Sequence, residues 1–224
     1  LVDKAGRNAN RVPPTWLIDL GLLERQDFQA WIVGTPEILG EPLLVVTDEY
    51  ARFDRSDRRV DILCLDLRGQ LTIVELKRDA AGSLADLQAL RYAAFCSTMT
   101  EAEMVSLYAE HHEVSETEAS QALKEFVESD VETLPAGRPR IILAAGSLDN
   151  VELTSTVLWL RQFGVDINCV EVATYEMPGR KEILVVPRVL IPLPEAREFM
   201  VGVEQQAVAA ARTRQARHDY APFF

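Results

Sequence analysis

The chain has 224 residues, 48% of them hydrophobic, and a formal net charge of −12 at pH 7. This length and composition suit one good-sized globular domain with room for an appendage. No apolar run approaches the ~20 residues that span a bilayer. A net charge this negative argues against a protein that binds nucleic acid over its whole surface. The sequence has no signal-peptide pattern, so we expect a cytoplasmic protein without a membrane partner.

The negative charge is concentrated in one segment, residues 101–133. This segment holds ten acids and one base, a net −9, and the rest of the chain holds 25 acids and 22 bases, a net −3. The rest of the chain can therefore still provide a surface that binds phosphate groups. The acidic segment is most simply a solvated helical face; a partner-binding surface and a DNA mimic are the alternatives.

The cysteines and histidines do not follow a metal-binding pattern. Cys64, Cys96 and Cys169 lie far apart in apolar runs, which predicts buried core residues in a reducing compartment. We expect His111 and His112 to end a helix.

The first 59 residues predict a lead-in, a helix, a strand and a charged turn. Residues 1–14 are polar and indicate a flexible lead-in or linker stump. Residues 22–33 predict an amphipathic helix that ends at Gly34, and residues 43–50 predict a strand. The residues expected on the apolar side of the helix are Leu23, Phe28, Trp31 and Ile32. Residues 54–59 are a charged turn.

Residues 59–78, RVDILCLDLRGQLTIVELKR, predict a buried β-hairpin. Asp66 and Gly69 suit a type I turn that is followed by a left-handed glycine. A three-residue loop over 67–69 pairs Asp66 with Gln70 and, in the same register, Asp61 with Glu75. Because side chains alternate between the two faces of a strand, Asp61, Glu75 and Lys77 then share one face.

Three ionisable groups on a buried face are costly unless something pairs them. An ion pair accounts for one acid and one base, whereas a divalent cation accounts for both acids. Mg²⁺ takes one or two carboxylates, keeps several waters and binds substrate phosphates. Lys77 would then orient or deprotonate a metal-bound water, and the ion would stabilise charge on a scissile phosphate. The alternative is a salt-bridged strand end in an unrelated α/β protein.

The spacing of these residues resembles the PD-(D/E)xK nuclease superfamily. Asp61, thirteen intervening residues and Glu75-x-Lys77 match its motif, with Val60 in place of the usual proline. Gln88-Ala-Leu-Arg-Tyr92 is similar to the Q-x-x-x-Y of the RecB-like branch. A closer resemblance, over residues 22–197, is to the C-terminal nuclease domain of NucS (EndoMS) type endonucleases. Four segments carry it in order: ERQDFQAWIVGTPEILGEPLLVV, RRVDILCLDLRGQLTIVELKRD, VLWLRQFGVDINCVEV and IPLPEA.

The resemblance implies an α/β, restriction-endonuclease-like fold, with a central mixed β-sheet flanked by helices. It implies Mg²⁺ or Mn²⁺ held by Asp61, Glu75 and the backbone carbonyl of Leu76, with Lys77 acting on the attacking water. Gln88 and Tyr92 would be supporting residues, although a surface amide and a half-buried tyrosine are the alternative.

Glu24 and several arginines are further candidates. Glu24 matches an additional acid of the superfamily, but a glutamate in a first turn is also an ordinary partner of a helix N-terminus. The candidates for phosphate contact, for which solvated positions are the alternative, are Arg55, Arg58, Arg59, Arg78 and Arg91.

The second half of the chain alternates between helix and strand, which predicts an α/β layer that extends the hairpin sheet. Helices are expected over residues 83–98, with Ser83 as N-cap, over 101–133 as a pair, and over 151–163. Strands are expected over residues 140–145, 166–173 and 182–190. We expect the domain to span residues 15–194, followed by a helical, partly basic tail over residues 195–224.

We therefore expect a divalent-metal-dependent nuclease that hydrolyses phosphodiester bonds, an endodeoxyribonuclease of DNA repair, restriction or phage defence. Its partners would be DNA and either a second copy of the chain or a protein of a larger assembly. The alternative is a catalytically silent nuclease-fold module that binds DNA or a protein partner.

Overall fold

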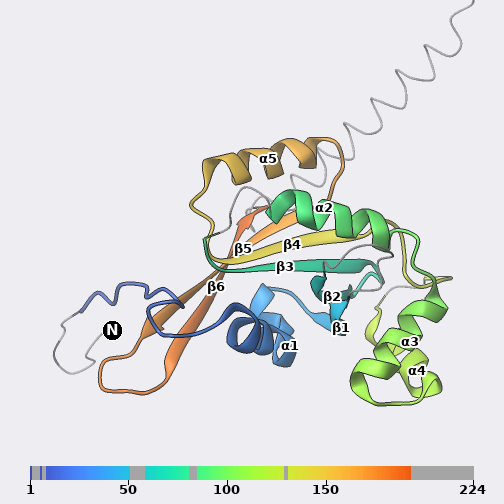
Figure 1. Ribbon diagram of the computed structural model, residues 1–224, viewed down its shortest axis with the longest axis horizontal. Helices are drawn as coiled ribbons and strands as arrows, with labels where there is room; N and C mark the ends of the chain where they lie inside the picture. The colour runs from blue at the N-terminus through green and yellow to red at the C-terminus, as the bar shows by residue number, and fades with distance from the viewer. Residues whose placement is uncertain (2–5, 7–8, 51–58, 81–84, 129–130, 193–224) are drawn as a thin grey trace, which may run out of the picture.

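The structure is a computed structural model that describes residues 1, 6, 9–50, 59–80, 85–128 and 131–192. Its centre is one mixed sheet of six strands in the order β1-β2-β3-β4-β5-β6, flanked by helices (Figure 1). The α/β fold expected from the sequence is thus confirmed. The strands are β1 Leu43–Tyr50, β2 Val60–Asp66, β3 Leu71–Ala80, β4 Arg140–Ser147, β5 Ile167–Glu176 and β6 Ile183–Ile191.

Strands β1, β2 and β3 are antiparallel neighbours, β4 and β5 continue the sheet parallel to β3, and β6 is antiparallel to β5. A connection between two parallel strands needs a long crossover. Helices α2, α3 and α4 form the crossover from β3 to β4, and α5 forms the crossover from β4 to β5. The helical elements are η1 Glu24–Gln29, α1 Ala30–Gly34, η2 Pro36–Leu39, α2 Ala85–Cys96, α3 Glu101–His112, α4 Glu116–Phe126 and α5 Val151–Gln162.

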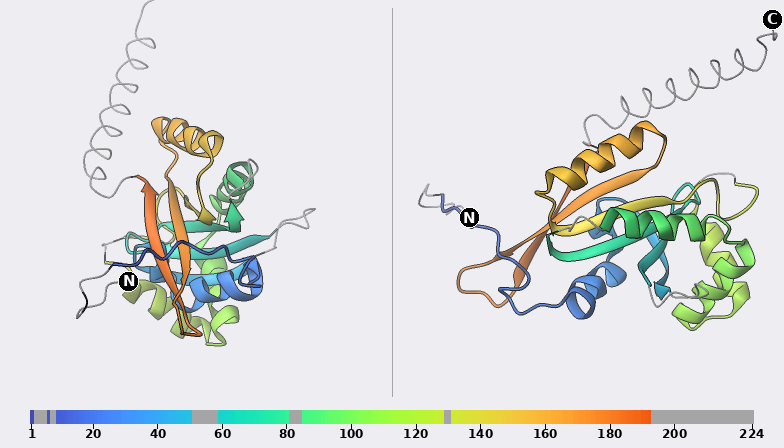
Figure 2. Two further views of the ribbon diagram at one scale, coloured as in Figure 1. Left: turned by 90° about the vertical axis from the view of Figure 1, so that its left-hand side faces the viewer. Right: turned by 45° about the horizontal axis from the view of Figure 1, so that its top comes forward.

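The sheet separates two apolar cores, because its strands are buried on both faces. Helices α2 and α5 cover one face, and α1 lies on the other (Figure 1; Figure 2). On the α2 face, Leu63 and Ile73 of the hairpin pack with Tyr92. On the opposite face, Ile62 and Val74 pack with residues of the N-terminal helices. Strand parity thus separates Leu63 and Ile73 from Ile62 and Val74, whereas Val60, at the start of β2, packs in the core of the α2 face.

The hairpin has the predicted register. Leu65 lies opposite Leu71, and Ile62 lies opposite Val74. Gly69 has a left-handed φ of 77°, and its N–H donates to the carbonyl of Asp66 at 2.9 Å. The turn is therefore closed over three residues, as the aspartate and glycine predicted.

Several expected boundaries were wrong, since β4 ends at Ser147 rather than residue 145 and β5 ends at Glu176 rather than residue 173. The N-terminal helix begins at Glu24 as a π-helical turn, and Leu23 precedes it with an extended backbone and a side chain that is 44% exposed. Leu23 therefore does not join Phe28 and Ile32 in the core. Strand β3 continues through Ala80, two residues beyond the expected end of the hairpin, because Ala80 pairs with Ser147 of β4.

The acidic segment is a pair of helices, as expected. A capping box of Ser115 and Glu118, whose S-x-x-E pattern is visible in the sequence, starts α4, and a second one, of Thr100 and Glu103, starts α3. His111 and His112 end α3, where Nε2 of His112 lies 2.8 Å from the carbonyl oxygen of Val45 in β1. This contact holds the helix pair at the β1 edge of the sheet.

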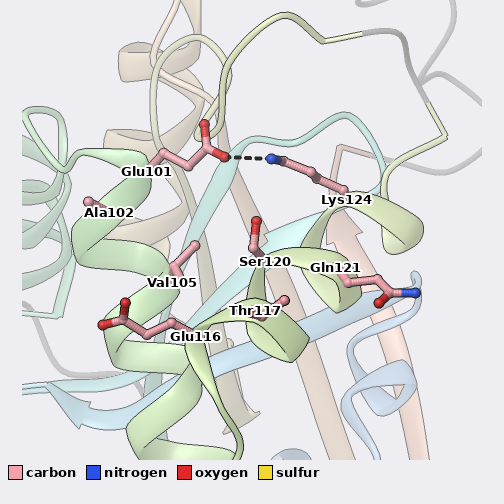
Figure 3. Close-up of a pocket in the computed structure, with 8 residues that line it drawn as sticks. All are labelled: Glu101, Ala102, Val105, Glu116, Thr117, Ser120, Gln121 and Lys124. Carbon is pink, nitrogen blue, oxygen red and sulfur yellow. Dashed lines mark ion pairs between the residues drawn. The ribbon is translucent and has the colours of Figure 1, made fainter.

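Acidic and polar side chains line a surface hollow between α3 and α4. Glu101 and Lys124 form a 3.1 Å ion pair across it (Figure 3). Its lining residues are Glu101, Ala102, Val105, Glu116, Thr117, Ser120, Gln121 and Lys124. The hollow lies outside the hairpin that carries the candidate site.

The three cysteines are buried and unbridged, as expected. Within the described ranges, no helix has both the length and the apolar character to cross a bilayer. The charged turn over 54–58, Ser83 and the tail over 195–224 lie outside the described residues.

Candidate active site

Asp61 and Glu75 occupy neighbouring strands at one end of the hairpin. Because Ile62 lies opposite Val74, the same register places Asp61 opposite Glu75. Both side chains are withdrawn from solvent: Asp61 is 9% exposed and Glu75 is 1% exposed. Oδ2 of Asp61 accepts a 2.8 Å hydrogen bond from the backbone N–H of Leu76. This bond ties the carboxylate of β2 to the backbone of β3.

Lys77 lies on the same face of β3 and contacts Glu75 directly. Its Nζ donates a 2.8 Å hydrogen bond to Oε1 of Glu75. The second oxygen of Glu75, Oε2, is buried and has no hydrogen-bond partner among the residues that the structure describes. A buried carboxylate oxygen of this kind costs free energy unless a further group binds it.

Burial and nearby charges, among them Asp61, shift the pKa values of Glu75 and Lys77. Burial, and then the charge of Asp61, raise the pKa of Glu75 to about 7, against the opposing effect of Lys77. Burial lowers the pKa of Lys77, but the charge and hydrogen bond of Glu75 outweigh burial and raise it above its usual value.

Glu24, at the start of η1, is electrostatically coupled to this cluster. Its charge contributes to raising the pKa of both Glu75 and Lys77. Its side chain is half-buried. The additional acid expected from the sequence is therefore near the two carboxylates, on an element that contacts β3.

Gln88 and Tyr92 face each other on α2. Nε2 of Gln88 donates a 3.0 Å hydrogen bond to the hydroxyl oxygen of Tyr92. Tyr92 is buried in the core on the face of the sheet that holds Ile73 and Leu143. Strand alternation places Glu75 on that same face, since Glu75 lies beside Leu143. The Q-x-x-x-Y pair thus joins the side of the sheet that carries the acids.

The predicted arginines are only partly within the described residues. Arg59 forms a 2.6 Å ion pair with Glu49, and Arg91 is exposed on α2. Arg55 and Arg58 lie outside the described residues. Arg78 belongs to β3, but its side chain is not described.

The sequence analysis missed Glu49. Asp48 lies opposite Ile62 and Tyr50 lies opposite Val60, so Glu49 is at the position opposite Asp61 on β1. Its φ of 47° is unusual for a non-glycine residue, and its carboxylate is turned to Arg59. Strand pairing alone could have indicated it, but a β-bulge between Val45 and Thr47 sets the register.

The donor set fits a hard divalent cation. Asp61 and Glu75 place two carboxylates on paired strands, and one oxygen of Glu75 is buried without a hydrogen-bond partner among the described residues. Mg²⁺ takes one or two carboxylates and fills its other positions with water. In the described part of the chain, no group of three or more His, Cys, Asp or Glu side chains is arranged to hold a metal.

Comparison with known proteins gives weak matches only. No protein-family model and no curated protein matches the chain. Among solved structures, it is similar to "Structure of EndoMS-dsDNA2 complex", with 19% identity and a TM-score of 0.37 over 66% of this chain and 44% of that chain. It is also similar to a repair endonuclease from Pyrococcus abyssi, with 19% identity and a TM-score of 0.36 over 65% of this chain and 46% of that chain. The match spans less than half of each structure and does not identify a family.

Proposed function

We propose that the chain is a divalent-metal-dependent nuclease that hydrolyses phosphodiester bonds in DNA. The observation that carries the proposal is the buried carboxylate of Glu75, which lies opposite Asp61, pairs with Lys77 and leaves one oxygen without a partner among the described residues. A structural ion pair would need neither the second acid nor the unsatisfied oxygen. A Mg²⁺ or Mn²⁺ ion would use both.

Asp61, Glu75 and the carbonyl of Leu76 would hold the ion. When bound, the ion would stabilise negative charge on the phosphate and lower the pKa of a bound water. The hydrogen bond from Leu76 N–H fixes one oxygen of Asp61 and so orients this carboxylate at the end of the hairpin, opposite Glu75.

Lys77 would position the attacking water and place positive charge beside the phosphate. Its raised pKa keeps it an ammonium while Glu75 is ionised. An ammonium has three donors and no acceptor, so it orients a water and stabilises charge rather than removing a proton. Gln88 and Tyr92 would support the site from α2, and Glu24 would add a third negative charge.

The test is cleavage of labelled DNA by the purified chain in Mg²⁺ or Mn²⁺, compared with EDTA. Single-stranded, double-stranded, mismatched and branched substrates are compared side by side, each with Lys77→Ala and Glu75→Gln. The control variants are Lys124→Ala and Glu101→Gln, which break an ion pair of similar length on α3 and α4. We expect metal-dependent cleavage that both site variants abolish and both control variants retain.

Either of two results would contradict the proposed function. Cleavage that survives Lys77→Ala and Glu75→Gln would place the reaction elsewhere in the chain. No cleavage of any substrate by the folded protein, and no Mn²⁺ binding that depends on Asp61, would favour a silent module that binds DNA or a protein partner.

A further inference from the structure

A cavity of about 180 Å³ lies where β4 leaves the sheet. Its wall on the sheet side is formed by the ends of β4 and β5, and its other wall is the N-terminal segment. The lining residues are Pro14, Thr15, Trp16, Leu17, Gly146, Ser147, Glu171, Ala173, Thr174 and Tyr175. Pockets for drug-sized ligands measure about 300–1,000 Å³. This cavity therefore suits a single small ring system.

The N-terminal wall is anchored to the sheet. The N–H of Thr15 donates to the carbonyl of Thr174 at 2.8 Å, and the buried hydroxyl of Thr174 donates back to the carbonyl of Thr15. Trp16 follows directly and is 46% exposed at the cavity. The two bonds fix the backbone directly before Trp16, and the Trp16 side chain is left with much of its surface open to solvent.

Strand register places this cavity beside the candidate site. Lys77 of β3 lies beside Ala145 of β4, and Ala145 lies beside Glu171 of β5. Two strand spacings separate Lys77 from Glu171, a distance of roughly 10 Å. Because Lys77 and Glu171 are at aligned positions, their side chains leave the same face of the sheet. The cavity also lies at the carboxyl ends of parallel strands, where α/β proteins commonly bind ligands.

The cavity combines an aromatic surface with a fixed hydrogen-bond acceptor. Arg188 donates a 2.9 Å hydrogen bond to Oε1 of Glu171 across the strand pair, which gives the carboxylate a defined orientation. A carboxylate has about four lone-pair positions, so it can accept further hydrogen bonds. Stacking of a base on an aromatic side chain is worth about 1–3 kcal/mol. A glutamate accepts hydrogen bonds from the amino groups of bases.

We propose that this cavity binds a nucleobase of the substrate strand next to the phosphodiester that is cut. Trp16 stacks on the base, and Glu171 accepts hydrogen bonds from its amino group. Bases with an amino group, such as guanine and cytosine, therefore bind more tightly than thymine. This inference rests on the proposed function for the identity of the substrate, but its test does not require cleavage.

The experiment uses the full chain with Trp31→Phe and Trp159→Phe, so that Trp16 is its only tryptophan. Trinucleotides with one central dG, dC or dT between abasic residues are added without divalent metal, and an all-abasic trinucleotide is the reference. We expect saturable quenching of Trp16 fluorescence, with dG and dC binding at least tenfold more tightly than the all-abasic probe. Glu171→Gln should remove the preference for dG and dC over dT.

The matched control is the chain with Trp16→Phe and Trp31→Phe, which keeps Trp159 on the outer face of α5, where it is 57% exposed. It should show no saturable quenching. Equal binding of all four trinucleotides, or equal quenching in the two chains, would overturn the proposal. If the double variants do not fold, the otherwise unmodified chain is titrated with a central 2-aminopurine, whose signal should change and should be lost in Trp16→Ala.

Because these titrations contain no divalent metal, their outcome is separate from cleavage. Base binding without cleavage would support this cavity while the nuclease proposal fails. Cleavage without base binding would support the nuclease proposal and contradict base binding in this cavity.

Discussion

The carboxylate of Asp61 on β2 accepts a hydrogen bond from the backbone N–H of Leu76 on β3 at 2.8 Å. The bond crosses the hairpin between Glu75 and Lys77, the two residues that flank Leu76. It therefore ties the position of the first acid to the strand that carries the other two charged groups. The site depends on this strand pairing as much as on the residue types.

Asp61→Asn removes the negative charge of this side chain but keeps an oxygen that can accept its hydrogen bond. The amide oxygen can still accept from Leu76, so we expect a melting temperature close to that of the unmodified protein. Cleavage should fall at least 100-fold, because the metal loses an anionic ligand. Activity is measured as kcat/KM on a labelled DNA, and folding by thermal melts. A variant that folds and keeps its activity would remove Asp61 from the site.

The pH dependence of cleavage should follow the carboxylate cluster. Burial raises the pKa of Glu75 to about 7, and a protonated carboxylate is a poor metal ligand. At limiting Mn²⁺, activity should therefore rise about tenfold per pH unit below 7 and level off above it. Saturating Mn²⁺ should move the rise to lower pH. A profile that is flat from pH 5.5 to 8 would contradict this assignment.

The same carboxylate should destabilise the metal-free fold at high pH. The folded pKa of Glu75 is raised from 4.5 to about 7, so the folded state holds this proton more tightly than the unfolded state. The resulting stabilisation is complete below pH 4.5 and is lost as the pH rises through 7. At pH 8, Glu75→Gln should raise the free energy of unfolding by about 1–3 kcal/mol, reduced by the loss of the Lys77 partner.

Urea titrations of the two proteins at pH 5 and pH 8, in EDTA, measure this difference. The variant should gain stability relative to the unmodified protein only at the higher pH. Mn²⁺ should stabilise the unmodified protein and leave Glu75→Gln nearly unchanged. An equal metal response in both would mean that the ion binds elsewhere.

Gly69 should be the least replaceable residue of the hairpin turn. It has a φ of +77°, and an added Cβ would meet Cδ2 of Leu134 at 2.7 Å. Gly179 has nearly the same φ, +74°, but nothing within 4 Å. Gly179→Ala should cost only the backbone strain, about 1–2 kcal/mol. Gly69→Ala should cost about 1–3 kcal/mol more through overpacking. Equal losses in urea unfolding would show that Leu134 moves away freely.

Arg140 should be a structural cation. It is buried, and its guanidinium donates to Glu41 at 2.7 and 2.8 Å and to Asp66 at 3.0 Å. Arg140→Met leaves two acids without this partner and should cost about 3–5 kcal/mol. The control is Arg188→Met, which breaks an ion pair whose arginine is exposed and should cost less than about 1 kcal/mol. Similar losses in both would contradict a structural role for Arg140.

The hairpin and the start of α4 could be predicted, because each depends on residues that are close together in the sequence. The period-2 alternation of the hairpin, its aspartate and glycine turn, and the capping box of Ser115 depend on residues within a few positions of one another. From these, the sequence predicts the pairing of Asp61 with Glu75 and the placement of Lys77 on their face. The start of η1 was predicted less well, since Leu23 is apolar but adopts an extended backbone before the helix.

Contacts between distant segments do not follow from local sequence patterns, and the candidate role of Glu24 came from a resemblance rather than from such a pattern. The charge of Glu24 acts on the pKa of Glu75 only because η1 packs on the sheet. Glu49 lies opposite Asp61 only because a β-bulge sets the register of β1. Trp16 and Glu171 line one cavity because Thr15 pairs with Thr174, which is 159 residues away along the chain.

The sequence by itself determined the hairpin and the alternation that places two acids and a lysine on one face. The tertiary structure decided how far that face is buried, and thereby the raised pKa of Glu75 and the position of its Oε2, which has no hydrogen-bond partner among the described residues. The reason is physical: residue spacing fixes the direction of a side chain along a strand, but its desolvation depends on helices and strands that pack against it from elsewhere in the chain.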